Sequence, residues 1–75
     1  MSDFRTGDLF VVYDLRGLEI GRATDRRDVR SVLAEAPPAA YDVFEFVATE
    51  HFFEYLRRYR FIKTKNDHFY GRVEA

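Results

Sequence analysis

Residues 50–73, EHFFEYLRRYRFIKTKNDHFYGRV, decide how many helices the fold contains. The first half of the stretch has apolar residues at helical spacing: Phe52, Tyr55, Leu56 and Tyr59. Thr49 can cap a helix that begins at Glu50. In the second half, Asn66 and Asp67 both tolerate positive φ and suit a two-residue hairpin turn. The stretch therefore predicts a helix over residues 50–60 and a β-hairpin over residues 60–73.

A turn at Asn66-Asp67 pairs Lys63 with Tyr70 across the hairpin and sorts the side chains onto two faces. The apolar face is expected to turn inward and holds Ile62, Thr64, Phe69 and Val73. The other face combines aromatic and cationic side chains. Together with Arg58 just before the hairpin, that face gives the candidate binding residues Arg58, Phe61, Lys63, Lys65, His68, Tyr70 and Arg72.

The N-terminal half predicts a hairpin and a short helix. Residues 7–24 alternate as two strands around Asp14-Leu15-Arg16-Gly17, a type I turn with glycine at its fourth position. In the following segment, TDRRDVRSVLAEA, apolar residues recur at one helical face, and Thr24 or Asp25 can cap its start. Pro37-Pro38 ends the helix.

Residues 41–48, YDVFEFVA, are compatible with two structures. Aromatic and β-branched residues favour a strand with Phe44, Phe46 and Ala48 inward, although one long helix over residues 39–60 also fits the spacing. With the strand, the order is β-β-α-β-α-β-β. The expected fold is a single α+β domain over residues 1–75, an antiparallel sheet with two helices packed on one face.

Composition limits the class of protein. The 75 residues include eight Phe and five Tyr, more aromatic surface than so small a core can enclose, so some rings should lie at the surface. The sequence has no cysteine, no apolar run long enough to cross a bilayer and no signal peptide at its N-terminus. We therefore expect a cytoplasmic protein without a membrane partner.

The charges are segregated along the chain. Residues 31–56 carry five acidic and no basic residues, whereas residues 57–72 carry six Lys or Arg and one Asp. A second candidate surface is acidic and comprises Glu45, Glu50 and Glu54. Whether the two segments attract separate partners or neutralise each other depends on whether they lie side by side in the fold.

Catalytic and metal-binding motifs are not found in the sequence. No serine has a nucleophile motif around it, and no glycine-rich phosphate loop occurs. His51 and Glu54 stand three residues apart, but two ligands without a second cluster make a poor metal site. We expect neither enzymatic activity, nor a metal, nor a cofactor.

The function expected from the sequence is a small non-enzymatic protein-interaction module, in the manner of an inhibitor or adaptor, with self-association into a homodimer as a companion expectation. The alternative is a single-stranded nucleic-acid-binding domain that uses the cationic and aromatic face of the C-terminal hairpin. A solvated edge hairpin without any partner explains the same lysines and arginines. The sequence does not name the partner.

Overall fold

The computed structural model describes the backbone of residues 7–65 and 69–74 and the side chains of residues 7–65. These residues form five strands and one helix. The strands are β1 (Leu9–Asp14), β2 (Glu19–Ala23), β3 (Ala40–Ala48), β4 (Phe53–Lys63) and β5 (Phe69–Glu74), and the helix is α1 (Arg26–Ala34).

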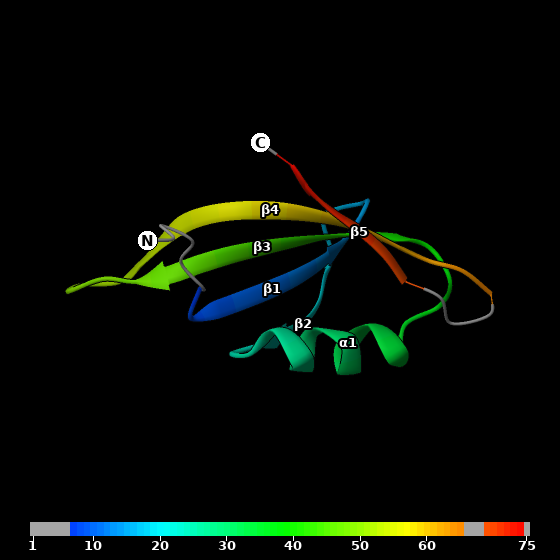
Figure 1. Cartoon of the computed structure of the whole chain (residues 1–75), viewed down its shortest axis with the longest axis horizontal. Coiled ribbons are helices and arrows are strands. Elements are labelled where there is room, and N and C mark those ends of the chain that lie inside the picture. Colours follow the sequence, from blue (N-terminus) through cyan, green and yellow to red (C-terminus); the bar gives the residue numbers. More distant parts are fainter. Residues whose placement is uncertain (1–6, 66–68, 75) are drawn as a thin grey trace, which may run out of the picture.

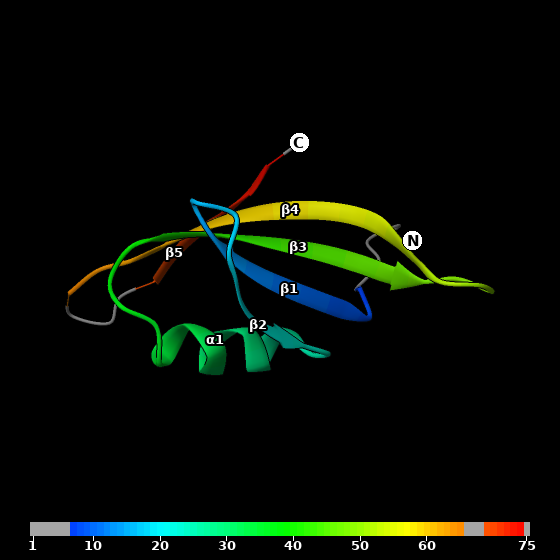
Figure 2. The same ribbon diagram turned by 180° about the vertical axis from the view of Figure 1, so that it is seen from behind.

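All five strands belong to one antiparallel sheet in the order β2-β1-β3-β4-β5. Because β2 and β3 both run antiparallel to β1, they run parallel to each other and need a crossover connection. The helix α1 provides this crossover and lies along one side of the sheet (Figure 1). In the opposite view α1 again lies below the strands, and no second helix of the described residues covers the other side of the sheet (Figure 2), which we call the open face.

The structure confirms the predicted first hairpin and the predicted short helix that follows it. Gly17 has a φ of 87° and its N–H donates to the Asp14 carbonyl at 3.0 Å, as the type I turn requires. At the start of α1, the Asp25 side chain accepts a hydrogen bond from the Arg27 N–H at 2.8 Å. Both features depend on side chains only a few residues apart, which is why the sequence predicts them.

Residues 41–48 are a strand, as preferred, but the predicted inward face of this strand is wrong. Tyr41, Val43 and Val47 are buried against the helix side, whereas Phe44 and Phe46 are half-buried on the open face. Both faces of the strand carry large apolar residues, so alternation could not tell which face turns inward.

The predicted helix over residues 50–60 is wrong, and with it the expected fold of two helices on a sheet. Residues 53–63 form β4, which pairs with β3 along its length. Thr49, expected to cap the helix, instead exchanges hydrogen bonds with Phe52 in the tight turn between β3 and β4. The described residues therefore contain one helix and a mostly β fold.

A β-bulge interrupts the alternation of side chains along β4. Glu45 pairs with Arg57 and Phe46 pairs with Tyr55, so Leu56 has no partner on β3. The extra residue reverses the alternation. Tyr55 and Arg58 consequently share the open face, whereas Tyr59, four residues after Tyr55, packs against the core on the helix side. The helical spacing of the apolar residues in this stretch therefore does not correspond to one face of the strand.

The C-terminal hairpin forms, with a register one residue away from the prediction. Lys63 pairs with Phe69 and Ile62 with Tyr70, instead of Lys63 with Tyr70. A shift of one residue exchanges the two faces of a strand. The predicted Asn66-Asp67 turn lies outside the described residues.

The core lies between α1 and the sheet. It comprises Phe10, Val12, Ala23, Val29, Leu33, Ala36, Tyr41 and Val43, with Ile20, Val32, Tyr59 and Phe61 packed against it. Tyr59 and Phe61 come from β4, so the strand that replaces the predicted helix contributes aromatic rings to the same core.

Candidate binding surfaces

Lys63, expected at the centre of the cationic surface, is buried beneath α1. Its side chain reaches the end of the helix, where Nζ donates hydrogen bonds to the carbonyl oxygens of Leu33, Ala34 and Ala36 at 2.8, 2.9 and 2.6 Å. The last carbonyls of a helix lack partners within it and carry partial negative charge. Lys63 therefore closes the C-terminal end of α1.

The four candidate binding residues with described side chains do not share one surface. Phe61 lies with Lys63 on the helix side, whereas Arg58 pairs with Phe44 and lies on the open face. Lys65 is exposed beyond the end of β4. The side chains of His68, Tyr70 and Arg72 lie outside the described residues.

The acidic candidates are also separated. Glu50 and Glu54 are exposed, while Glu45 is fully buried at 0% exposure. The Glu45 carboxylate accepts hydrogen bonds from the Tyr59 hydroxyl at 2.6 Å and from the Gly7 N–H, and it pairs with Arg57 Nε at 3.3 Å. Such a buried charge is tolerated because it is both paired and hydrogen-bonded.

The acidic and basic segments of the sequence neutralise each other in part across β3 and β4. Besides the Glu45–Arg57 pair, Arg60 Nε lies 2.5 Å from Asp42 Oδ1. Neighbouring antiparallel strands place directly paired side chains within reach of each other. These four charges therefore stabilise the sheet.

Tyr59 links the Glu45 carboxylate to the helix. Its hydroxyl donates to Glu45 Oε1 and accepts a hydrogen bond from Arg26 Nη2 at 2.9 Å. Burial of the phenol, together with the hydrogen bond to Glu45, raises the pKa of Tyr59. The hydroxyl is therefore held in one orientation between an acceptor on β3 and a donor on α1.

The open face carries a cluster of aromatic rings, which we call the aromatic patch: Tyr13, Phe44, Phe46 and Tyr55. The ring centroids of Tyr13 and Phe44 are 5.3 Å apart and meet edge to face. Tyr55 lies 6.1 Å from Phe44 and 6.3 Å from Phe46. These separations are typical of favourable aromatic pairs.

Charged residues surround the aromatic patch. Arg22 and Glu19 pair at 2.8 Å on β2, and Asp42 on β3, which lies beside Tyr13 of β1, pairs with Arg60 on β4. Arg58 differs from them, because its Nε atom has no hydrogen-bond partner among the residues that the structure describes. The open face thus has an apolar centre and a rim of both charges.

The sequence reasoning missed this patch, although two signals indicated it. The supply of aromatic residues exceeds what the core can enclose, and Tyr55, Phe52 and Phe53 are indeed exposed. Strand β3 has apolar residues on both faces. The sequence does not show that Tyr55 belongs to the patch, because the bulge at Leu56 is what places its side chain on the open face.

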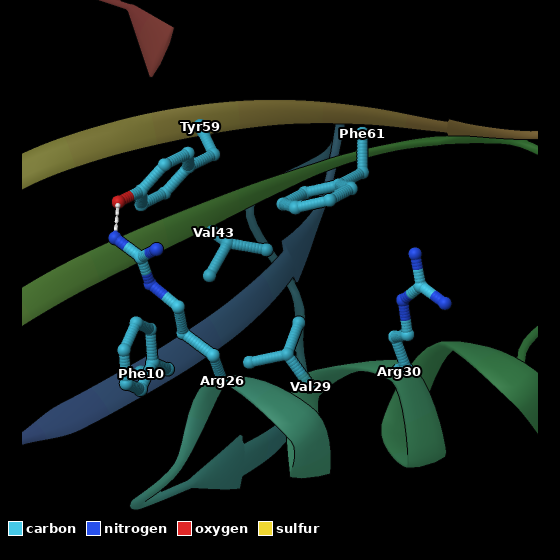
Figure 3. A pocket seen from close by; sticks show the side chains of 7 residues that line it. All are labelled: Phe10, Arg26, Val29, Arg30, Val43, Tyr59 and Phe61. Carbon is cyan, nitrogen blue, oxygen red and sulfur yellow. Dashed lines mark hydrogen bonds between the residues drawn. The ribbon is translucent and has the colours of Figure 1, made fainter. Parts of the chain in front are cut away.

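A pocket of about 210 Å³ lies on the opposite side of the sheet, between α1 and β4 (Figure 3). Its lining is mostly apolar, with two arginines from the helix: Phe10, Arg26, Val29, Arg30, Val43, Tyr59 and Phe61. The pocket is smaller than the roughly 300–1,000 Å³ of most small-molecule sites.

No cluster of three or more His, Cys, Asp or Glu that could hold a metal occurs within residues 7–65, the part with described side chains. In the same part of the chain, no helix has the length and apolarity needed to span a membrane.

Comparisons with protein-family models, with curated proteins and with solved structures give no significant match.

Proposed function

We propose that this protein is a small non-enzymatic protein-interaction module, and that its open face binds a second copy of the same chain. The observation that supports the proposal best is the aromatic patch on the side of the sheet that α1 does not cover. The patch spans β1, β3 and β4, three neighbouring strands of the sheet.

The apolar character of the open face is unusual for a sheet with one solvated side. In antiparallel sheets the residues facing water are normally polar. Here Tyr55 is 53% exposed, and Phe44 and Phe46 are half-buried beside it. Covering these rings with a second layer removes apolar area from water, at about 25 cal/mol per Å².

The charges on the open face favour another copy of the face itself. Its centre is aromatic, and the rim alternates in sign through the Arg22–Glu19 and Arg60–Asp42 pairs. In a two-fold dimer the same patch meets itself, so each rim arginine can approach a carboxylate of the other copy. Two sheets packed face to face in this way are a standard β-sandwich arrangement.

Sedimentation velocity over about 1 μM to 1 mM tests the proposal, a range in which weak homodimers dissociate measurably. The wild-type chain should pass from monomer to dimer with concentration. Tyr55→Thr keeps a residue suited to a strand and should weaken association about 10-fold or more, since a central aromatic residue often dominates an interface.

Phe52→Ser is the matched control. Phe52 is 68% exposed but lies in the turn between β3 and β4, away from the aromatic patch. The substitution should change the dissociation constant of the dimer less than about twofold, because scattered exposed rings contribute little to an interface. Circular dichroism of each variant establishes that it is folded.

Three results would overturn the proposal. The wild-type chain could stay monomeric throughout the range, or the two variants could weaken association equally. The third is binding of a labelled single-stranded oligonucleotide at low salt that Tyr55→Thr abolishes, since base stacking on exposed rings is how single strands are held. That result would support the nucleic-acid alternative instead.

A further inference from the structure

The pocket between α1 and β4 has an apolar interior with cationic groups at its edge. Its interior is lined by Phe10, Val29, Val43 and Phe61, the last of which comes from β4. Figure 3 shows the Arg26 and Arg30 side chains on either side of Val29. The two arginines are four residues apart on α1, so they lie on the same face of the helix.

Arg26 is held in place by a chain of hydrogen bonds. Its Nη2 atom donates to the Tyr59 hydroxyl at 2.9 Å, and this hydroxyl donates to the buried Glu45 carboxylate at 2.6 Å. The Arg26 guanidinium carbon also lies 5.8 Å from the centre of the Tyr59 ring. A guanidinium fixed before a ligand arrives loses less conformational entropy on binding.

The Arg30 guanidinium makes no hydrogen bond or ion pair with the residues whose side chains the structure describes, and Arg30 is exposed at the edge of the pocket. The nearby carboxylate of Asp25 is engaged by Arg27 at 3.5 Å. No carboxylate lines the pocket. Its edge therefore presents two positive charges beside an apolar interior.

We propose that this pocket binds an organic carboxylate with a small apolar group. The carboxylate lies between Arg26 and Arg30, and the apolar group enters the space lined by Val29, Val43 and Phe61. Arginine presents planar, paired donors that match a carboxylate. The volume of about 210 Å³ limits the apolar group to a short aliphatic chain or a single residue.

Two sources share this chemistry, a free short-chain acid and the C-terminal residue of a polypeptide. Hexanoate represents the first and N-acetyl-leucine the second. The pocket lies on the helix side of the sheet and the aromatic patch on the open face, so neither this inference nor the proposed dimer depends on the other.

An NMR titration of the ¹⁵N-labelled chain measures binding of each probe. Hexanoate and N-acetyl-leucine should shift the amide signals of Val29, Val43 and Phe61. Hexanamide, the neutral counterpart of hexanoate, should have an affinity at least about 10-fold lower, because it lacks the charge that makes hydrogen bonds to arginine strong. The tighter of the two acids identifies the source.

Arg30→Gln tests the role of the cationic edge, with Arg27→Gln as its matched control. Both residues are exposed on α1, but Arg27 does not line the pocket. Arg30→Gln should raise the dissociation constant of hexanoate about 5- to 10-fold, while Arg27→Gln should change it less than twofold.

Equal effects of the two substitutions would overturn the proposal, because they indicate attraction by the net charge alone. Equal binding of hexanoate and hexanamide would also overturn it, as would the absence of any shift at Val29, Val43 and Phe61 up to about 10 mM probe, where even millimolar affinities are visible.

Discussion

At the scale of single residues, the two buried charges of the described side chains, Glu45 and Lys63, are neutralised in different ways. Glu45 pairs with an arginine and accepts two further hydrogen bonds, whereas Lys63 donates hydrogen bonds to three backbone carbonyls at the end of the helix. Glu45 thereby connects β3 to β4, and Lys63 connects β4 to the end of α1. Removing either partner leaves a buried polar group without its bond.

Lys63→Met should destabilise the fold by about 2–3 kcal/mol, because it keeps the aliphatic stem and removes the donor to three carbonyls. Lys65→Met is the control, since Lys65 is exposed, and it should cost less than about 0.5 kcal/mol. Urea unfolding of both variants measures the difference. If the two substitutions cost the same, Lys63 does not close the helix end.

Stability should fall at alkaline pH because burial raises the pKa of Tyr41 and Tyr59 in the folded state. A raised folded pKa stabilises the protein fully below the unfolded value of about 10. This contribution is lost as the pH rises from there through the folded pKa, since the unfolded chain releases its proton first.

Tyr59→Phe removes one of the two phenols with a raised pKa, so the free energy of unfolding should fall less steeply with pH above about 10. At pH 7 the substitution should cost about 1–2 kcal/mol through the lost hydrogen bond to Glu45. Urea unfolding between pH 7 and 11, with phenolate absorbance followed in parallel, measures both effects. Identical alkaline slopes for Tyr59→Phe and the wild-type chain would contradict the assignment.

At the scale of elements, α1 packs closely on β2 at a glycine. A Cβ atom added to Gly21 would lie 2.8 Å from Val32 Cγ1 and 3.3 Å from Cγ2, both on the helix. Such a contact is too short for carbon atoms, so either the Val32 side chain or the helix would have to move. The absence of a side chain at Gly21 therefore allows Val32, and with it α1, to lie close to β2.

Gly21→Ala should cost about 1–3 kcal/mol through this overpacking, and in a Val32→Ala background it should cost much less, because the methyl groups it meets are gone. A double-mutant cycle by urea unfolding measures the coupling. Strictly additive costs would show that the two residues do not limit how closely α1 approaches β2.

The elements that the sequence predicts well are those fixed by near neighbours. The Asp14–Gly17 turn and the Asp25 cap need only local hydrogen bonds, and both are confirmed. The helix predicted over residues 50–60 is wrong because the helical spacing of Tyr55 and Tyr59 is coincidental. The bulge at Leu56 places these two side chains on opposite faces of β4. That bulge is defined by pairing with β3, which local sequence does not specify.

At the scale of the whole molecule, the candidate sites depend on which side of the sheet each residue takes. Lys63 and Phe61 were expected outside and lie on the helix side, whereas Phe44 and Phe46 were expected inside and lie on the open face. Both outcomes follow from the position of one helix, because α1 covers one face and leaves the other. The surplus of aromatic residues was predictable from composition, but its location was not.

An isotope-filtered NOE experiment on an equal mixture of ¹³C-labelled and unlabelled chains tests most directly whether the open face binds a second copy. The proposed dimer predicts contacts between chains from the rings of Phe44, Phe46 and Tyr55, and none from α1. Contacts between chains that involve α1 would contradict the proposed dimer. So would the absence of any contact between chains at about 1 mM, a concentration at which a weak dimer is still populated.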